Sequence, residues 1–282
     1  MNISIMGGDL RIARLAEMYA KENYNIYTYG LENFFNKKKN NDKIVMCSNI
    51  EETIKKSNIV IGGIPFLKDE IFINAPFSSR NITIDELKEK LCYKTFVAGG
   101  IPNSFYNNTI NNIDLLQNEK LTILNAIPTV EGTIKIAIEE REETIFESNV
   151  LICGFGRIGK ILCDRFFDLG ANVFCSARKE SDLTWIREKR YIPIEYNDIC
   201  KYANKFDLII NTVPTKIIDR EKLDCLNKNI LIIDLASNPG GIDKNYAEKI
   251  GIRVISALGI PGKEMPNTAA KYIKEIIDKI IV

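Results

Sequence analysis

The feature that most constrains the fold is a glycine-rich turn between an apolar run and a helical pattern. Residues 150–153 are apolar, as in a buried parallel strand, and Gly154, Gly156 and Gly159 follow with G-x-G-x-x-G spacing. In such a unit the first glycine makes the tight turn, the second admits a pyrophosphate, and the third lets the helix pack on the strand. The helix N-terminus would hold the pyrophosphate. The pattern therefore predicts a dinucleotide site over Gly154, Phe155, Gly156, Arg157, Ile158 and Gly159.

The end of the next predicted strand, residues 172–177, indicates which dinucleotide binds. A site selective for NAD places Asp or Glu about 20 residues after the glycine motif, where it bonds the ribose 2′-hydroxyl. This chain instead carries Ser176, Arg178 and Lys179. A guanidinium matches the geometry of a phosphate, whereas the alternative reading is a solvated basic turn. The position of these residues favours NADP(H).

Composition excludes several classes of function. The net charge of +1 gives no reason to expect nucleic acid or an anionic membrane as a partner, and no apolar run is expected to cross a bilayer. The chain contains no histidine and no Cys-x-x-Cys spacing, which excludes His-dependent triads and zinc sites, and no metal site is predicted. Its seven cysteines show no paired spacing, and Cys153, Cys163 and Cys175 lie in apolar segments. Reduced core cysteines and a start without a basic signal region predict a cytoplasmic protein.

Strand and helix patterns alternate along the chain, with short turns that contain glycine. Alternation of this kind is typical of parallel, doubly wound sheets. We therefore predict an α/β protein with two Rossmann-like domains and a cleft between them. Residues 1–126 would form an N-terminal, Rossmann-like or flavodoxin-like substrate domain, with residues 121–124 as its last strand. Residues 127–146 would form a linking helix, and residues 147–282 the NADP-binding domain with an amphipathic C-terminal helix. The return of this helix to the first domain stays open.

Candidate ligand-binding residues lie where the predicted strands end. In open α/β sheets, ligands bind outside the carboxyl ends of the strands. Further cofactor contacts are therefore predicted at the nicotinamide ribose, from Asn211, Thr212, Val213 and Pro214, and at the nicotinamide, from Ala236 and Ser237. The candidate anion-binding residues for the substrate are Arg11, Ser78, Ser79, Arg80, Thr133 and Lys263. Each alone is more often a surface residue, and the convergence of loops selects them. No catalytic residue is predicted.

Several motifs together are similar to those of one known family. The run 150–159, the exit Ser176-Ala177-Arg178-Lys179 and the segments 235–241, 259–263, 7–11 and 128–133 resemble the dipicolinate synthase A-subunit family. The match runs in order through nearly the whole chain. The second half also looks like the cofactor domain of 2-hydroxy-acid and S-adenosylhomocysteine-type dehydrogenases. One departure is Phe146, where the family pattern leads us to expect histidine within Ile-His-Gly-Ser.

The resemblance implies a reaction, a partner and a location. The reaction is oxidation of dihydrodipicolinate, formed from a lysine-pathway intermediate, to pyridine-2,6-dicarboxylate with reduction of NADP. The implied partner is the flavoprotein-like B-subunit of dipicolinate synthase, and the location is the cytoplasm of the mother cell of spore-forming bacteria. Loss of a hydride makes the ring aromatic, so a strong general base is less necessary than in alcohol oxidation. This chemistry suits a chain without histidine.

Two alternatives stay open at the level of the sequence. One is another NADP-dependent dehydrogenase of the 2-hydroxy-acid or shikimate type, whose usual His–carboxylate or Lys–Asp pair is not recognisable here. The other is an assembly protein that binds NADP without turnover. Assembly into a homo-oligomer is also open.

Overall fold

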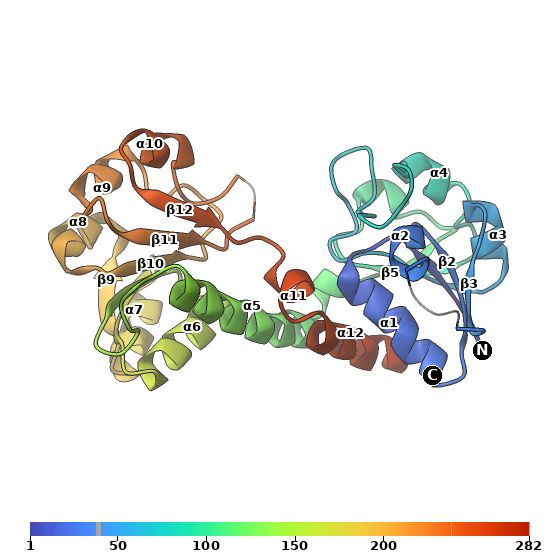
Figure 1. The fold of residues 1–282 in the computed structure, drawn as a ribbon, viewed down its shortest axis with the longest axis horizontal. Coiled ribbons are helices and arrows are strands. Elements are labelled where there is room, and N and C mark those ends of the chain that lie inside the picture. Colours follow the sequence, from blue (N-terminus) through green and yellow to red (C-terminus); the bar gives the residue numbers. More distant parts are fainter. Residues whose placement is uncertain (38–40, 238, 282) are drawn as a thin grey trace. The chain divides into compact units, whose positions relative to one another are not determined.

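The computed structural model describes residues 1–37, 41–237 and 239–281, and the chain forms two units. The first unit comprises Met1–Asn125 and Pro261–Val282, and the second comprises Ala126–Ile260 (Figure 1). The C-terminal segment, predicted to belong with residues 147–282, therefore belongs to the first unit. The predicted end of the first domain at residue 126 is close to the observed division, and residues 127–146 are part of the second unit.

The first unit is built on a six-stranded parallel sheet with the order β3-β2-β1-β4-β5-β6. Its strands are β1 (Asn2–Met6), β2 (Asn25–Tyr29), β3 (Ile44–Met46), β4 (Ile59–Ile61), β5 (Thr95–Ala98) and β6 (Asn111–Asp114). Its helices include α1 (Leu10–Lys21), α2 (Glu32–Phe35), α3 (Ile50–Lys55), α4 (Ile84–Lys88), and the 3-10 helices η1 (Asn103–Phe105) and η2 (Leu115–Gln117). This strand order is that of a doubly wound dinucleotide-binding sheet.

The second unit repeats this topology, with the order β12-β11-β10-β7-β8-β9. Its strands are β7 (Asn149–Cys153), β8 (Asn172–Ala177), β9 (Ile192–Glu195), β10 (Leu208–Asn211), β11 (Leu231–Asp234) and β12 (Arg253–Ser256). Its helices include α6 (Arg157–Asp168), α7 (Glu180–Glu188), α8 (Ile199–Tyr202), α9 (Arg220–Cys225), α10 (Lys244–Lys249), η3 (Tyr196–Asp198) and η4 (Ala203–Lys205). The prediction of two doubly wound parallel sheets is confirmed.

Helix α5 (Glu119–Glu139) runs from one unit into the other. It includes residues 121–124, so the strand predicted there is wrong, and β6 is the last strand of the first sheet. Among the described residues, α5 is long and apolar enough to cross a membrane by length and composition alone, contrary to the expectation of no such stretch. Leu121 is buried in the core of the first unit, and Val130 and Ala137 in that of the second. Burial in these cores accounts for part of the apolar composition, since 39% of the most apolar stretch of the helix is buried.

Helix α12 (Pro266–Ile281) packs against α1 and completes the core of the first unit. Ile273 and Ile277 on its apolar face are fully buried. Burial of an isoleucine side chain stabilises a fold by about 1.5–3 kcal/mol, so packing of this face against the apolar residues of α1 stabilises the first unit. The Tyr19 hydroxyl also donates to Asp278 at 3.0 Å. The amphipathic pattern was predicted with its partner left open, and the partner is α1 of the first unit.

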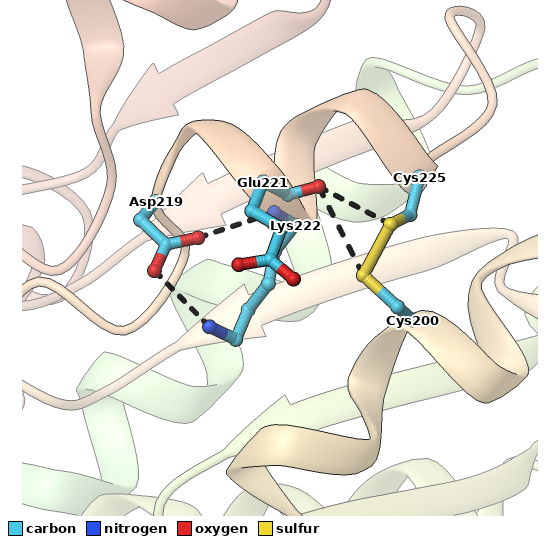
Figure 2. The surroundings of a disulfide bond; sticks show 5 residues. All are labelled: Cys200, Asp219, Glu221, Lys222 and Cys225. Carbon is cyan, nitrogen blue, oxygen red and sulfur yellow. Dashed lines mark hydrogen bonds and ion pairs between the residues drawn. A yellow bond between two sulfur atoms is a disulfide. The ribbon is translucent and has the colours of Figure 1, made fainter.

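A disulfide joins Cys200 of α8 to Cys225 of α9, which corrects the expectation of unpaired cysteines (Figure 2). Figure 2 also shows Lys222 paired with Asp219 at the start of α9, at 3.2 Å. Cys153, Cys163 and Cys175 are buried and free, as predicted. The crosslink closes a loop with a sequence separation of 25 residues, which contains β10. A loop of this size lowers the entropy of the unfolded chain enough to stabilise the fold by about 3 kcal/mol.

Candidate functional site

The turn between β7 and α6 has the geometry of an anion site. Gly156 is the N-cap of α6 and provides no side-chain hydrogen bond to the first amides of the helix. Apart from the adjoining chain, no atom of the described residues lies within 4 Å of the place where a Cβ on Gly156 would stand. A phosphate can therefore approach the backbone there and meet the amides and the positive end of the helix dipole.

The other two glycines are required by the protein's own packing. Gly154 has φ +98, and a Cβ on it would overlap the Thr212 hydroxyl. A Cβ on Gly159 would overlap the carbonyl oxygen of Gly154, so α6 can pack on the turn because residue 159 is glycine. The three predicted glycine tasks thus correspond to three different surroundings, one open and two crowded.

The end of β8 presents one part of the predicted 2′-phosphate site and hides another. Arg178 and Lys179 are exposed directly after the strand. Ser176 is fully buried, and its side chain lies beside the Cys153 thiol. Helices cover both faces of a doubly wound sheet, so a side chain inside the strand faces the core. The structure therefore corrects the prediction that the Ser176 hydroxyl meets a phosphate, while its backbone oxygen accepts from Gly154 N–H at 2.8 Å.

The predicted nicotinamide-side residues of β10 lie beside the glycine turn. The Thr212 hydroxyl donates to the Cys153 carbonyl oxygen at 2.8 Å, which ties the exit of β10 to the end of β7. The buried Asn211 amide donates to Val213 O at 3.0 Å, and Val213 N–H donates back to Asn211 Oδ1 at 3.1 Å. Pro214 follows in an exposed position. Asn211 thus shapes this loop, and residues 212–214 present its surface.

A charged pair at the end of β11 was missed by the sequence reasoning. Asp234 has no exposed surface, and its Oδ1 accepts from the Asn211 amide at 2.8 Å and from Ala236 N–H at 3.3 Å. Its Oδ2 lies 3.0 Å from Lys244 Nζ. Ser237 is exposed after the buried Ala236. The sequence did contain a signal for this pair. Asp234 ends an apolar strand, and a buried aspartate is rare unless it has a charged partner.

Three of the candidate substrate residues line one cavity in the first unit. The cavity has a volume of about 540 Å³ and is lined by Lys68, Ile73, Asn74, Ala75, Pro76, Ser78, Ser79, Arg80, Asn81 and Ile82. Arg80 Nε donates to the Tyr29 hydroxyl at 2.8 Å, and its Nη1 donates to Glu86 at 3.0 Å. The guanidinium is half exposed, with 46% of the side chain accessible. It can therefore meet a ligand in the cavity while its internal partners hold its position.

Arg11 and Thr133 have structural roles instead of the predicted substrate contacts. The Arg11 side chain is 6% exposed and pairs with Asp9 at 2.7 Å, and it also donates to the carbonyl oxygen of Ile64. Its charge is already compensated inside the protein. Thr133 is buried within α5, where its hydroxyl donates to Thr129 O at 2.7 Å.

Lys263, at the end of α11 (Ile260–Lys263), is exposed. Its neighbour Gly262 packs against the pair formed by Asp9 and Arg11, where an added Cβ would overlap the aspartate. Lys263 is therefore held close to the turn after β1 in the first unit. It remains available to a ligand, unlike Arg11.

The thiol at the end of β7 is unsuited to nucleophilic chemistry. Burial raises the pKa of Cys153 to about 12, so the thiol stays protonated at neutral pH. A thiol in that state is a poor nucleophile. The turn and the strand ends around it instead provide backbone amides, exposed cations and fixed loops. These groups suit binding and orientation of a dinucleotide, whose own chemistry performs hydride transfer.

Comparisons with known proteins agree along the whole chain. The model of the N-terminal domain of the dipicolinate synthase A-subunit matches residues 2–117. The dipicolinate synthase A-subunit of Bacillus subtilis (strain 168) is 30% identical over 288 residues, which cover 100% of this chain and 96% of that protein. The crystal structure of the dipicolinate synthase A-subunit from Bacillus halodurans has a TM-score of 0.87 and 26% identity, and covers 100% of this chain and 97% of that one.

A further relative matches only part of the chain. Shikimate dehydrogenase (NADP(+)) of Methanococcus maripaludis (strain C7 / ATCC BAA-1331) is 26% identical over 149 residues. The match covers 45% of this chain and 49% of that enzyme.

The glycine surroundings predict opposite results for two substitutions. Gly156→Asp should leave the fold intact, because the position is open, yet abolish NADPH binding, because the carboxylate would occupy the phosphate's path. Gly159→Ala should instead destabilise the second unit, because its Cβ meets the Gly154 carbonyl. Circular dichroism melting and fluorescence titration with NADPH measure the two effects. An unchanged NADPH affinity in Gly156→Asp would contradict the placement of the pyrophosphate.

Proposed function

Because the chain belongs to the dipicolinate synthase A-subunit family, we propose that it oxidises dihydrodipicolinate to dipicolinate with NADP as the hydride acceptor. The observation that carries this proposal is the similarity over the full length to a member of that family. The open space at Gly156 supports it independently, because the second glycine of such a turn is where a pyrophosphate approaches the backbone.

The chemistry makes modest demands on the side chains of the protein. A hydride leaves a ring carbon for the nicotinamide, a proton leaves the ring, and the product is the aromatic pyridine-2,6-dicarboxylate. Aromaticity supplies much of the driving force, so orientation of the ring against the nicotinamide is the main task. The protonated Cys153 thiol is left out of this reaction, and the proton acceptor is not assigned to a side chain.

The choice of NADP is proposed from the end of β8. Arg178 and Lys179 are exposed where the second strand of the nucleotide-binding unit ends, and the last residue of that strand is Ala177 and not a carboxylate. A carboxylate at this place would repel a 2′-phosphate, whereas the guanidinium can pair with it. The partial similarity to an NADP-dependent shikimate dehydrogenase agrees with this choice.

The substrate is a dianion and needs compensating donors. We assign one carboxylate to the cavity of the first unit, where Ser78, Ser79 and Arg80 provide hydroxyls and a cation. Lys263 is the further cation proposed for substrate binding in that unit. We also propose that the chain acts with the flavoprotein-like B-subunit, in the cytoplasm of the mother cell during sporulation.

Turnover is the direct test of the function. The purified chain, alone and with its flavoprotein-like partner, should convert dihydrodipicolinate to dipicolinate with one NADPH formed per ring oxidised. Absorbance of NADPH and of the pyridine product measures both sides of the reaction. Shikimate is the control substrate, and oxidation of shikimate in place of dihydrodipicolinate would favour the alternative dehydrogenase. Binding of NADP without any turnover, even with the partner present, would favour an assembly protein.

Cofactor selectivity should depend on Arg178. Arg178→Ala removes a charge-assisted hydrogen bond worth about 1.5–3 kcal/mol, so the Kd for NADPH should rise roughly tenfold or more. The Kd for NADH, which lacks the 2′-phosphate, should barely change. Titration of both cofactors against the same variant makes NADH the internal control. Equal losses for the two cofactors would give Arg178 a structural role.

Substrate binding should depend on Arg80 and Lys263. Arg80→Met and Lys263→Met keep a flexible, unbranched side chain and remove its charge, so each should raise KM for dihydrodipicolinate and leave the Kd for NADPH intact. Lys55→Met is the matched control, since Lys55 is an exposed cation on α3 that pairs with Glu51. Wild-type KM in both site variants would place the dicarboxylate elsewhere.

A further inference from the structure

We propose that the ion pair of Asp234 and Lys244 sets the relative affinity of the second unit for the oxidised and the reduced forms of NADP. This inference rests on the proposed function, since it concerns the same cofactor site. It assigns a positioning and charge-balancing role to two residues that the glycine motif does not include.

The strand order places this pair on the nicotinamide side. β7 is central and carries the glycine turn for the pyrophosphate, with β8 on one side and β10 and β11 on the other. The 2′-phosphate end of the dinucleotide belongs to the end of β8, so the nicotinamide half extends over the ends of β10 and β11. Asp234 is the last residue of β11 and lies opposite Asn211, the last residue of β10, in the register of the sheet.

The two charges of the pair cancel, and one of the two side chains is buried. Asp234 is fully buried, and the Asn211 amide and Ala236 N–H donate to its Oδ1. Lys244 Nζ is 3.0 Å from Oδ2, and its side chain is 33% exposed. A carboxylate this deeply buried needs a cation close by. Gly240 packs over both side chains, where a Cβ would stand 2.9 Å from Asp234 Oδ2.

The charge of the nicotinamide ring differs between the two forms of the cofactor. The ring is cationic in NADP⁺ and neutral once it has accepted a hydride. An unbalanced carboxylate beside the ring would bind NADP⁺ more tightly relative to NADPH, whereas an unbalanced lysine would do the reverse. With the pair intact these effects offset each other. The pair thereby lets the site release NADPH without holding NADP⁺ too firmly.

Equilibrium titration of the full chain with NADP⁺ and NADPH tests the inference. Lys244→Met should lower the ratio of Kd for NADP⁺ to Kd for NADPH by roughly threefold to tenfold, as expected for one charge in a partly screened site. Asp234→Asn should raise the ratio, and the double variant should return close to the wild-type ratio. Lys244→Arg keeps the charge and should keep the ratio.

Lys189→Met is the matched control, because Lys189 also pairs with an aspartate of the same unit, Asp164, at 2.9 Å. The ratio of the Kd for NADP⁺ to the Kd for NADPH in Lys189→Met should equal that of the wild type. A merely structural pair would weaken both forms alike, so an unchanged ratio in Asp234→Asn and Lys244→Met overturns the inference. If Lys244→Met fails to fold, Asp234→Asn and Lys244→Arg decide the result. Failure of the wild-type chain to bind either form would instead overturn the proposed NADP site.

Discussion

The close approach of α6 to the carbonyl oxygen of Gly154 is the contact on which the second unit depends. With glycine at residue 159, the helix begins directly above the end of β7, and its first amides point to open space beside Gly156. The same turn leaves room for Thr212, whose hydroxyl joins the neighbouring strand end to it. A single steric requirement thus brings together the anion site, the central strand and the loop of β10.

Local patterns were sufficient to predict the fold class, because each βα unit carries its own period and its own turn. The predictions were wrong where contacts between residues far apart in the sequence decide the structure. Residues 121–124 are apolar and read as a strand, but they continue into a helix whose apolar face enters both cores. The partner of α12 could not be read from its amphipathic stripe, because periodicity defines a face and not what covers it. The disulfide joins short helices on either side of β10, a proximity that sequence spacing does not reveal.

The glycine turn of the candidate site was predicted correctly, whereas the roles of several charged side chains were not. The positive φ of Gly154 and the approach of Gly159 to the Gly154 carbonyl are local, so the turn could be predicted directly, whereas the contact of Gly154 with Thr212 could not. Arg11 looked like a ligand-binding cation, yet Asp9, two residues earlier, already neutralises it. The partner of Asp234 comes from the next helix, Lys244, and the burial of the carboxylate depends on the whole unit. The role of a charged side chain depends on its partners and its burial in the folded protein, which cannot be read from the sequence alone.

The return of α12 to the first unit has a consequence for how the chain is made. Residues 126–260 are continuous, so this unit can complete its core as soon as they leave the ribosome. The first unit is split between the two ends of the sequence. The apolar face of α1 is therefore uncovered until Ile273 and Ile277 have been made. The half that is translated first is therefore completed last. Until the residues of α12 have been made, the apolar face of α1 stays exposed to water, although every strand of its sheet is already present.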